Sequence, residues 1–265
     1  MYKEEKMRFI ENQINSLRKI NELHKQLCDI DSSLAKIYPV TVVKDDVFFV
    51  FDLDEVSENY EFKLEYPAPM HVGSGILASF PLEFYNMKSS AIVSEEVFNN
   101  LEGYVFIFHE FVHCYQWETC EREIRKSLEI ERKSKENNNF MWEITHPFPY
   151  ENSTFINKTV ELGNYLNSGE YLKVLNYHKE IKGYLKKIDY EYMIWQEWKE
   201  GFARYIENLV RARLDINKNI NSLQAPFDRV CFYEIGSKYI ELLTEADKSL
   251  KHNLKKLYFR MFNSI

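Results

Sequence analysis

The chain has 265 residues, of which 45% are hydrophobic and 28% charged, and its formal net charge at neutral pH is −7. This length suits one large domain or two small ones, and the composition is that of a folded protein rather than a disordered one. The acidic balance favours neither a nucleic-acid partner nor an anionic membrane partner. Four scattered cysteines, no signal-peptide pattern and no long apolar run predict a reduced, cytoplasmic protein without a membrane span.

A helix and a set of strands are predicted over the first third of the chain. Residues 4–30 carry apolar side chains at three- and four-residue steps, which is the spacing of an amphipathic helix. The segments YPVTVV and VFFVFDL, separated by KDD, are rich in β-branched and aromatic residues and predict a hairpin. Further strands are predicted at YEFKLEY, GILASF and SAIVS. The pattern becomes helical from about Ser94 onward.

The order of these elements predicts an α+β fold in which strands come first and helices second. We expect one catalytic domain over residues 1–265, with an N-terminal helix and β-rich lobe at 1–93 and a helical lobe at 94–265. In the helical lobe, CEREIRKSLEIERKSKENNN predicts a charged helix that ends in an Asn-rich break. The segment HPFPYEN predicts a loop, because its two prolines disfavour a helix.

The segment YVFIFHEFVHCYQW places two histidines and a glutamate inside an apolar run. His109 and His113 are four residues apart, so on a helix both imidazoles lie on one face, within reach of one ion. Neutral imidazole is a common zinc ligand, and Glu110 would stand about 100° around the helix, where it can take a proton from a water molecule. The alternative is two satisfied core histidines and a capped glutamate. An accidental HExxH match is rare, so the pattern predicts a zinc site.

A catalytic zinc needs a third protein ligand. The downstream candidates are Glu143, His146, Glu161 and Glu200. Glu200 lies in IWQEWKEGFARYIEN, whose apolar residues follow helical spacing and would press this helix against the HExxH helix. Gly201 leaves room for the close approach of another helix. These features favour Glu200 over the other three.

HEFVH followed by EGFARYIE resembles the gluzincin metallopeptidases, and most closely the aminopeptidase N family. The resemblance implies a zincin-like fold in which His109, His113 and Glu200 hold one Zn²⁺ ion per chain. It also implies that Glu110 is the catalytic base. The function that follows from it is that of a zinc-dependent peptidase, a hydrolase with a peptide or protein as its substrate.

CFYEIGSKYIELL resembles the Y-x-x-G helix of the same family, whose tyrosine hydroxyl hydrogen-bonds the oxyanion of the tetrahedral intermediate. The resemblance assigns that role to Tyr233, with Gly236 completing the motif; Tyr239 and His146 are the alternative donors. Two features depart from the family. The stretch between the HExxH and glutamate motifs is longer, which predicts a helical insertion at about residues 120–190. HVGSGILASF lacks the glutamate of the family's G-x-M-E-N strand, so strict aminopeptidase specificity is not expected.

Three weaker candidates and two other functions stay open. Glu207, two turns beyond Glu200, could orient a histidine ligand or be a surface acid. Cys114 shares the side of Glu110 and could line a cleft, although a small core residue is the more common role. Either GILASF or SAIVS could bind a substrate backbone by edge pairing. The chain could also be a catalytically inactive zincin-fold binding or regulatory protein, or a zinc hydrolase acting on a non-peptide substrate.

Overall fold

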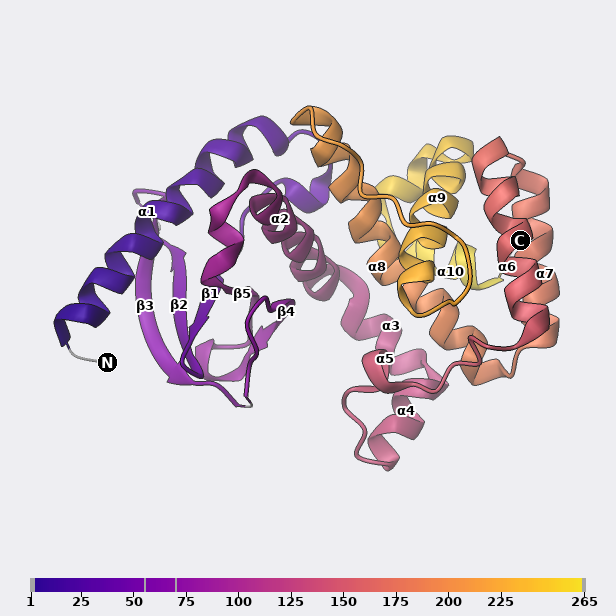
Figure 1. The fold of residues 1–265 in the computed structure, drawn as a ribbon, viewed down its shortest axis with the longest axis horizontal. Helices are drawn as coiled ribbons and strands as arrows, with labels where there is room; N and C mark the ends of the chain where they lie inside the picture. Colours follow the sequence, from indigo (N-terminus) through magenta and orange to yellow (C-terminus); the bar gives the residue numbers. More distant parts are fainter. Residues whose placement is uncertain (1–2, 55, 70, 264–265) are drawn as a thin grey trace. The chain divides into compact units, whose positions relative to one another are not determined.

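The computed structural model describes residues 3–54, 56–69 and 71–263. The chain forms two compact units (Figure 1). Unit 1 comprises Met1–Glu118 and Leu209–Asn217, and unit 2 comprises Thr119–Asn208 and Lys218–Ile265. A mixed sheet in unit 1 and helices in unit 2 confirm the predicted α+β class. The helix that carries the HExxH residues belongs to unit 1, with the sheet.

Unit 1 contains a five-stranded sheet in the order β3-β2-β1-β5-β4. Its strands are β1 Val40–Lys44, β2 Val47–Leu53, β3 Tyr60–Pro67, β4 Leu77–Leu82 and β5 Lys88–Ser94. β1 and β5 run parallel, whereas β1–β2, β2–β3 and β4–β5 are antiparallel. Asp45 and Asp46 join β1 to β2, and both have positive φ, as a two-residue type I′ turn requires. The predicted hairpin and the three further strands are confirmed.

Helices and loops cover the two faces of this sheet. The helix α1, Lys3–Leu27, packs by Phe9 against Phe49 of β2, with 4.7 Å between the ring centroids. The helix α2, Leu101–Gln116, packs beside β4 and β5 (Figure 1). The opposite face carries a second apolar cluster, formed by Val43, Phe48, Val50, Leu82 and Ile92. Side chains between Leu64 and Tyr85 pack over that cluster, so loops cover it.

Unit 2 is built from helices and connecting loops. A π-helical turn, Trp117–Glu121, follows α2 and leads into the remaining helices: α3 Arg122–Ser127, α4 Glu129–Glu136, α5 Trp142–Thr145, α6 Ser153–Ser168, α7 Tyr171–Tyr184, α8 Lys187–Arg213, α9 Val230–Ala246 and α10 Leu254–Asn263. The last turn of α8 is counted with unit 1. Short 3-10 turns lie at Ser32–Leu34, Glu83–Tyr85, Glu95–Asn99 and Lys248–His252.

Two predictions for the helical half have different outcomes. HPFPYEN is a loop, as predicted. The charged segment after Cys120 was predicted as one helix, but it is divided between α3 and α4 at Leu128. Leu128 has extended backbone dihedrals, and its side chain is buried together with those of Ile124 and Ile130 on either side of the break. None of the helices within the described ranges has both the length and the apolar character needed to cross a bilayer.

Helices α8 and α9 cross at a pair of glycines. A Cβ added to Gly236 would stand 2.0 Å from the carbonyl oxygen of Glu197, and one added to Gly201 would stand 2.6 Å from the Cα of Gly236. Any larger residue would therefore push the two backbones apart. This contact confirms the predicted close approach at Gly201. On α8, the neighbouring Trp198 donates its indole N–H to the carbonyl of Leu254, at 3.0 Å, and so ties α8 to the start of α10.

We predict that Gly236→Ala lowers the free energy of unfolding by about 3 kcal/mol, because the added methyl group overlaps the backbone of α8. Gly183→Ala is the matched control. Gly183 also lies in a helix, but a Cβ there meets no atom within 4 Å, and alanine should stabilise α7 by about 0.5 kcal/mol. Urea unfolding followed by circular dichroism measures both variants. Equal stability of the two variants would contradict the close contact.

Candidate metal and catalytic site

The helix α2 fixes the positions of the two HExxH imidazoles. Its N-terminus is capped by Asn100, whose side-chain oxygen accepts a hydrogen bond from the Gly103 N–H at 2.9 Å. His109 and His113 are one helical turn apart and are 8% and 6% exposed. Apolar residues on α2 surround them, so the sequence places two polar rings in a setting that offers little water.

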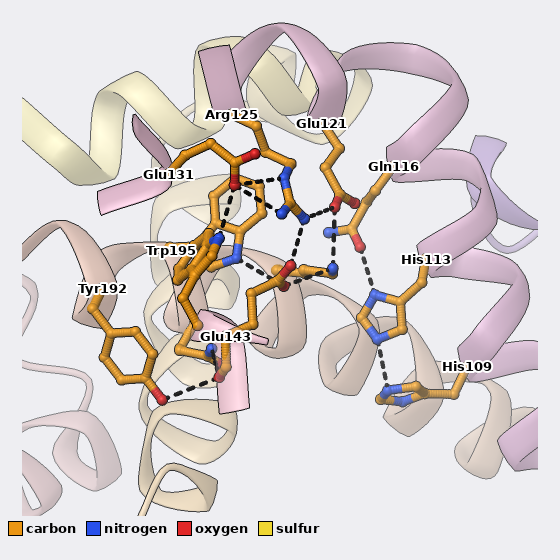
Figure 2. A network of polar contacts seen from close by, with 12 residues as sticks. His109, His113, Gln116, Glu121, Arg125, Glu131, Glu143, Tyr192 and Trp195 are labelled. Atoms are coloured by element: carbon orange, nitrogen blue, oxygen red, sulfur yellow. Dashed lines mark hydrogen bonds and ion pairs between the residues drawn. The ribbon is translucent and has the colours of Figure 1, made fainter. Parts of the chain in front are cut away.

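The two imidazoles converge at their Nε2 atoms, which lie 3.2 Å apart. Nδ1 of His113 lies 2.8 Å from Oε1 of Gln116, and the amide oxygen can only accept, so Nδ1 donates and Nε2 is the acceptor nitrogen that faces His109 (Figure 2). Two nitrogens at zinc–nitrogen distances of about 2.0–2.1 Å and this separation subtend about 100–105° at the ion, close to a tetrahedral angle. The pair therefore fits the geometry of a zinc site.

Glu110 is a buried carboxylate between these histidines. Only 7% of its surface is exposed. Among the described residues, no hydrogen bond or ion pair to its carboxylate is formed. Buried acidic side chains are normally paired, because an uncompensated charge is costly to remove from water. The packing around Glu110 therefore gives its carboxylate no structural partner among the described residues.

Glu200 and Tyr233 both belong to unit 2. Glu200 lies on α8 next to Gly201, and Tyr233 lies on α9 one turn before Gly236, so the glycine crossing lies beside both residues. Both side chains are half-buried. The crossing thus fixes the position of the candidate third ligand along α8 relative to that of the candidate oxyanion donor along α9.

The other three candidates for a third ligand are engaged elsewhere in unit 2. His146 Nε2 lies 2.8 Å from a carboxylate oxygen of Asp189, and the ring packs against Tyr192. Glu161 accepts a hydrogen bond from the hydroxyl of Tyr165 on the same helix. Glu143 belongs to an ion network, described next. Glu200, unlike these three, offers a carboxylate oxygen within 4.8 Å of a ring nitrogen of both His109 and His113.

A network of five charged side chains stabilises the fold around α8. Figure 2 shows Glu121, Glu131 and Glu143 gathered around the guanidinium of Arg125. The ammonium of Lys199 lies 2.8 Å from Glu143 and 3.1 Å from Glu121, so the residue next to Glu200 is fixed by two carboxylates. Indole N–H groups add further donors to the network: that of Trp195 to Glu143 and that of Trp142 to Glu131.

The network also sets the charge state of Glu143. Burial alone would raise the pKa of this carboxyl group, but Lys199 and Arg125 outweigh it and hold the pKa well below its usual 4.5. Burial lowers the pKa of the Lys199 ammonium, and the opposing attraction of Glu121 and Glu143 raises it above its ordinary value. Both groups therefore stay ionised at neutral pH, and α8 is held by fixed charges.

Two arginines lie over the ring of Tyr233. The guanidinium carbon of Arg204 is 5.8 Å from the ring centroid and that of Arg229 is 5.7 Å from it. Arg204 lies one turn beyond Glu200 on α8 and contacts Glu207, with its Nε 3.3 Å from a carboxylate oxygen. Glu207 is buried, so it is not a surface acid; besides Arg204 it accepts a hydrogen bond from the Asn219 side chain at 2.9 Å, and its role in orienting a histidine stays a prediction.

Two alternatives named from the sequence belong to the core. Tyr239 is fully buried and stacks on His178 with 4.1 Å between the ring centroids, and its hydroxyl oxygen has no hydrogen-bond partner in the described part of the chain. Cys114 is also fully buried, and burial raises the pKa of its thiol. Tyr233, which is half-buried, is thus better placed than Tyr239 to meet a substrate.

The sheet decides between the two predicted docking strands. β5, which contains SAIVS, lies between β1 and β4, so both of its edges are already paired. β4, which contains most of GILASF, pairs only with β5 and is an edge strand beside α2. A cavity of about 210 Å³ lies beside the start of β4, with Leu77 on the strand and Phe106 on α2 among its lining residues.

The ion network and the two arginines were not predicted. The acidic and basic residues after Cys120 repeat at four-residue intervals, which is also the pattern of a solvated helix. The one available signal is positional. Arg204 lies four residues after Glu200 and Arg229 four residues before Tyr233, so each shares a helical face or end with a candidate site residue.

Comparison with known proteins adds no assignment: no family model matches the chain, and neither a curated protein nor a solved structure matches it.

We predict that Glu143→Gln lowers the free energy of unfolding at pH 7 by about 3 kcal/mol, because Arg125 and Lys199 lose a buried counter-charge. The folded-state pKa of Glu143 is lowered, so its stabilisation is present above the unfolded value of about 4.5 and is lost as the pH falls below it. The difference between the variant and the wild type should therefore shrink between pH 5 and pH 2. Glu136→Gln, in an exposed pair with Arg132, should change little at any pH. Urea titrations over this pH range measure all three proteins; a pH-independent difference would contradict the assignment.

Proposed function

We propose that this protein is a zinc-dependent peptidase of the gluzincin type. In this proposal, His109, His113 and Glu200 hold the ion, Glu110 is the general base, and Tyr233 is the oxyanion donor. The observation that carries the proposal is Glu110: a residue that is 7% exposed, whose carboxylate forms no hydrogen bond or ion pair among the described residues, and which follows His109 on the helix where two imidazoles converge.

The donor set supports zinc over other ions. Among the described residues, His109, His113 and Glu200 are the group of His, Cys, Asp and Glu side chains that could hold a metal ion. Two imidazoles and one carboxylate suit zinc in a catalytic site, whereas calcium and magnesium prefer oxygen ligands alone. The 3.2 Å separation of the two Nε2 atoms fits the same choice.

The hydrolysis divides into steps assigned to named side chains. A zinc ion at this site supplies Lewis-acid chemistry, which makes water more acidic and polarises a carbonyl group. Glu110 takes the proton of the attacking water molecule and delivers it to the leaving amine. Tyr233 donates a hydrogen bond to the carbonyl oxygen as negative charge develops on it. The fixed charges of Arg125, Glu143 and Lys199 hold α8 so that Glu200 needs no reorganisation.

The substrate proposed for this site is a peptide or protein in extended conformation. The edge of β4 presents backbone donors and acceptors beside the helix that carries Glu110, and a peptide can add to such an edge as a further strand. The cavity at the start of β4 offers room for a side chain of that peptide. The sheet, the HExxH helix and the later glutamate helix follow one another in the order proposed for a zincin-like fold.

We predict that the wild type binds one zinc ion per chain, that His113→Ala loses it, and that Glu110→Gln retains it while hydrolysis falls by about 10²–10⁴-fold. Loss of one imidazole removes a ligand, whereas a glutamine amide has nearly the size of the glutamate carboxylate but cannot accept the proton. Glu136→Gln is the control, because Glu136 is an exposed acid of α4 that pairs with Arg132. Metal content by mass spectrometry and cleavage of a peptide library are the two measurements.

The outcomes separate the three functions considered from the sequence. Stoichiometric zinc without cleavage of any peptide would sink the peptidase proposal and favour a non-peptide hydrolase or an inactive binding protein. Unchanged zinc content in the His113→Ala variant would contradict the metal site itself. Full activity in the Glu110→Gln variant would remove the proposed general base.

We predict that Tyr233→Phe lowers kcat by about 10²-fold with little change in KM, because the lost hydroxyl donates to the oxyanion only as charge develops. Tyr239→Phe is the matched control on the same helix: its hydroxyl is buried without a partner, so its loss should change neither kcat nor stability. Steady-state kinetics on one cleaved peptide decide between the two tyrosines. A large loss in Tyr239→Phe with none in Tyr233→Phe would reverse the assignment.

A further inference from the structure

We propose that Arg229 recognises a carboxylate of the substrate close to the scissile bond, so that peptides with a negative charge at that position are preferred. Arg229 immediately precedes α9 and is half-buried. Its guanidinium lies over the ring of Tyr233 at 5.7 Å. This inference rests on the proposed function, because it takes Tyr233 as the residue that contacts the reacting carbonyl.

The guanidinium of Arg229 lacks a counter-ion. Within the described ranges, it takes part in no ion pair or hydrogen bond; it lies over the ring of Tyr233, and its charge also acts on the hydroxyl of Tyr192. Two other arginines of unit 2, Arg125 and Arg204, do have counter-ions. Arg125 contacts three glutamates, and Arg204 is paired with Glu207 and also donates to Asn221. Arg229 therefore has a charge and N–H donors that can bind a ligand.

The nearest acidic neighbour along the chain is not available to Arg229. Asp228 is exposed, and its carboxylate accepts a hydrogen bond from the Val230 N–H at 2.9 Å, which caps the start of α9. Asp228 is thus adjacent to Arg229 in the sequence, but its carboxylate caps α9. The positive charge of Arg229 stays uncompensated at the end of α9 that carries Tyr233.

The chemistry of the guanidinium selects the ligand. It remains protonated at all physiological pH values, and its planar fork of donors matches the two oxygens of a carboxylate. A partner held next to Tyr233 during hydrolysis must be part of the substrate. A peptide offers such a group in two ways, as a free C-terminus or as an acidic side chain, and both present the same carboxylate chemistry to Arg229.

The test uses zinc-loaded full-length protein and one peptide that it cleaves, resynthesised in matched forms. One pair differs only in a C-terminal acid or amide, and the other differs only in Glu or Gln at each position beside the cleaved bond. We expect kcat/KM to be about 10–100-fold higher for a carboxylate form than for its neutral partner, through KM, as for a charge-assisted hydrogen bond. The pair that shows the preference identifies the source of the carboxylate.

Arg229→Gln should abolish this preference, chiefly by raising KM for the charged peptide. Arg229→Lys should restore part of it, because lysine keeps the charge but not the planar fork. Arg132→Gln, which removes an exposed arginine of α4, should leave the preference intact. Equal kcat/KM for both members of both pairs in the wild type would overturn the proposal while leaving the peptidase intact.

Binding without turnover separates this inference from the proposed function. Calorimetry on the Glu110→Gln variant measures the Kd of acetyl-Ala-Phe-Leu-Ala, as the free acid and as the amide. A second pair of peptides carries Glu or Gln in place of Leu. We expect tighter binding of a carboxylate form, weakened by added salt and lost when Arg229→Gln is combined with Glu110→Gln. If binding is salt-sensitive and depends on Arg229 but the zinc-loaded wild type cleaves no peptide, the recognition is supported and the peptidase is refuted. If the wild type cleaves peptides and neither binding nor cleavage depends on Arg229, the peptidase is supported and the recognition by Arg229 is refuted.

Discussion

The burial of the Glu110 carboxylate is the constraint on which the interpretation of this protein depends. An isolated charge in an apolar setting costs several kilocalories per mole, and folded chains normally compensate it with hydrogen bonds or a counter-charge. The described residues supply neither to Glu110, while the Nε2 atoms of His109 and His113 converge to 3.2 Å beside it. The proposed zinc ion would account for both observations, because a divalent cation attracts a carboxylate and is bound by imidazole nitrogens.

Unit 2 meets a different requirement, which is to hold α8 and α9 in fixed positions. Two interactions do this, and they act on opposite sides of Glu200 in the sequence. Lys199, which precedes it, lies between two carboxylates, and Gly201, which follows it, lies against Gly236 of α9. The pairing of fixed charges with a glycine contact gives a helix that neither slides nor rotates easily, and a ligand on such a helix loses little freedom on binding.

The fold class and every strand could be predicted from the sequence, because the β-branched and aromatic runs are short and separated by strong turn residues. The order of the strands could not. β1 and β5 pair although they lie far apart in the chain, and that pairing decides that SAIVS is interior and GILASF is at the edge. The break at Leu128 was missed because Ile124 and Leu128 are four residues apart, which is the spacing of one continuous helix. The roles of Glu121, Glu131 and Glu143 were missed because an acid repeated at helical spacing has the same pattern in solvent and in a network.

The open edge of β4 has a consequence for how the chain behaves at high concentration. An exposed strand edge can pair with the same edge of another copy, which is a route to self-association. β4 contains Pro81, whose nitrogen has no hydrogen to donate, so pairing is limited to the residues before it. The strand thus has a short stretch that can pair with another strand and a proline that ends the pairing, which limits the growth of aggregates.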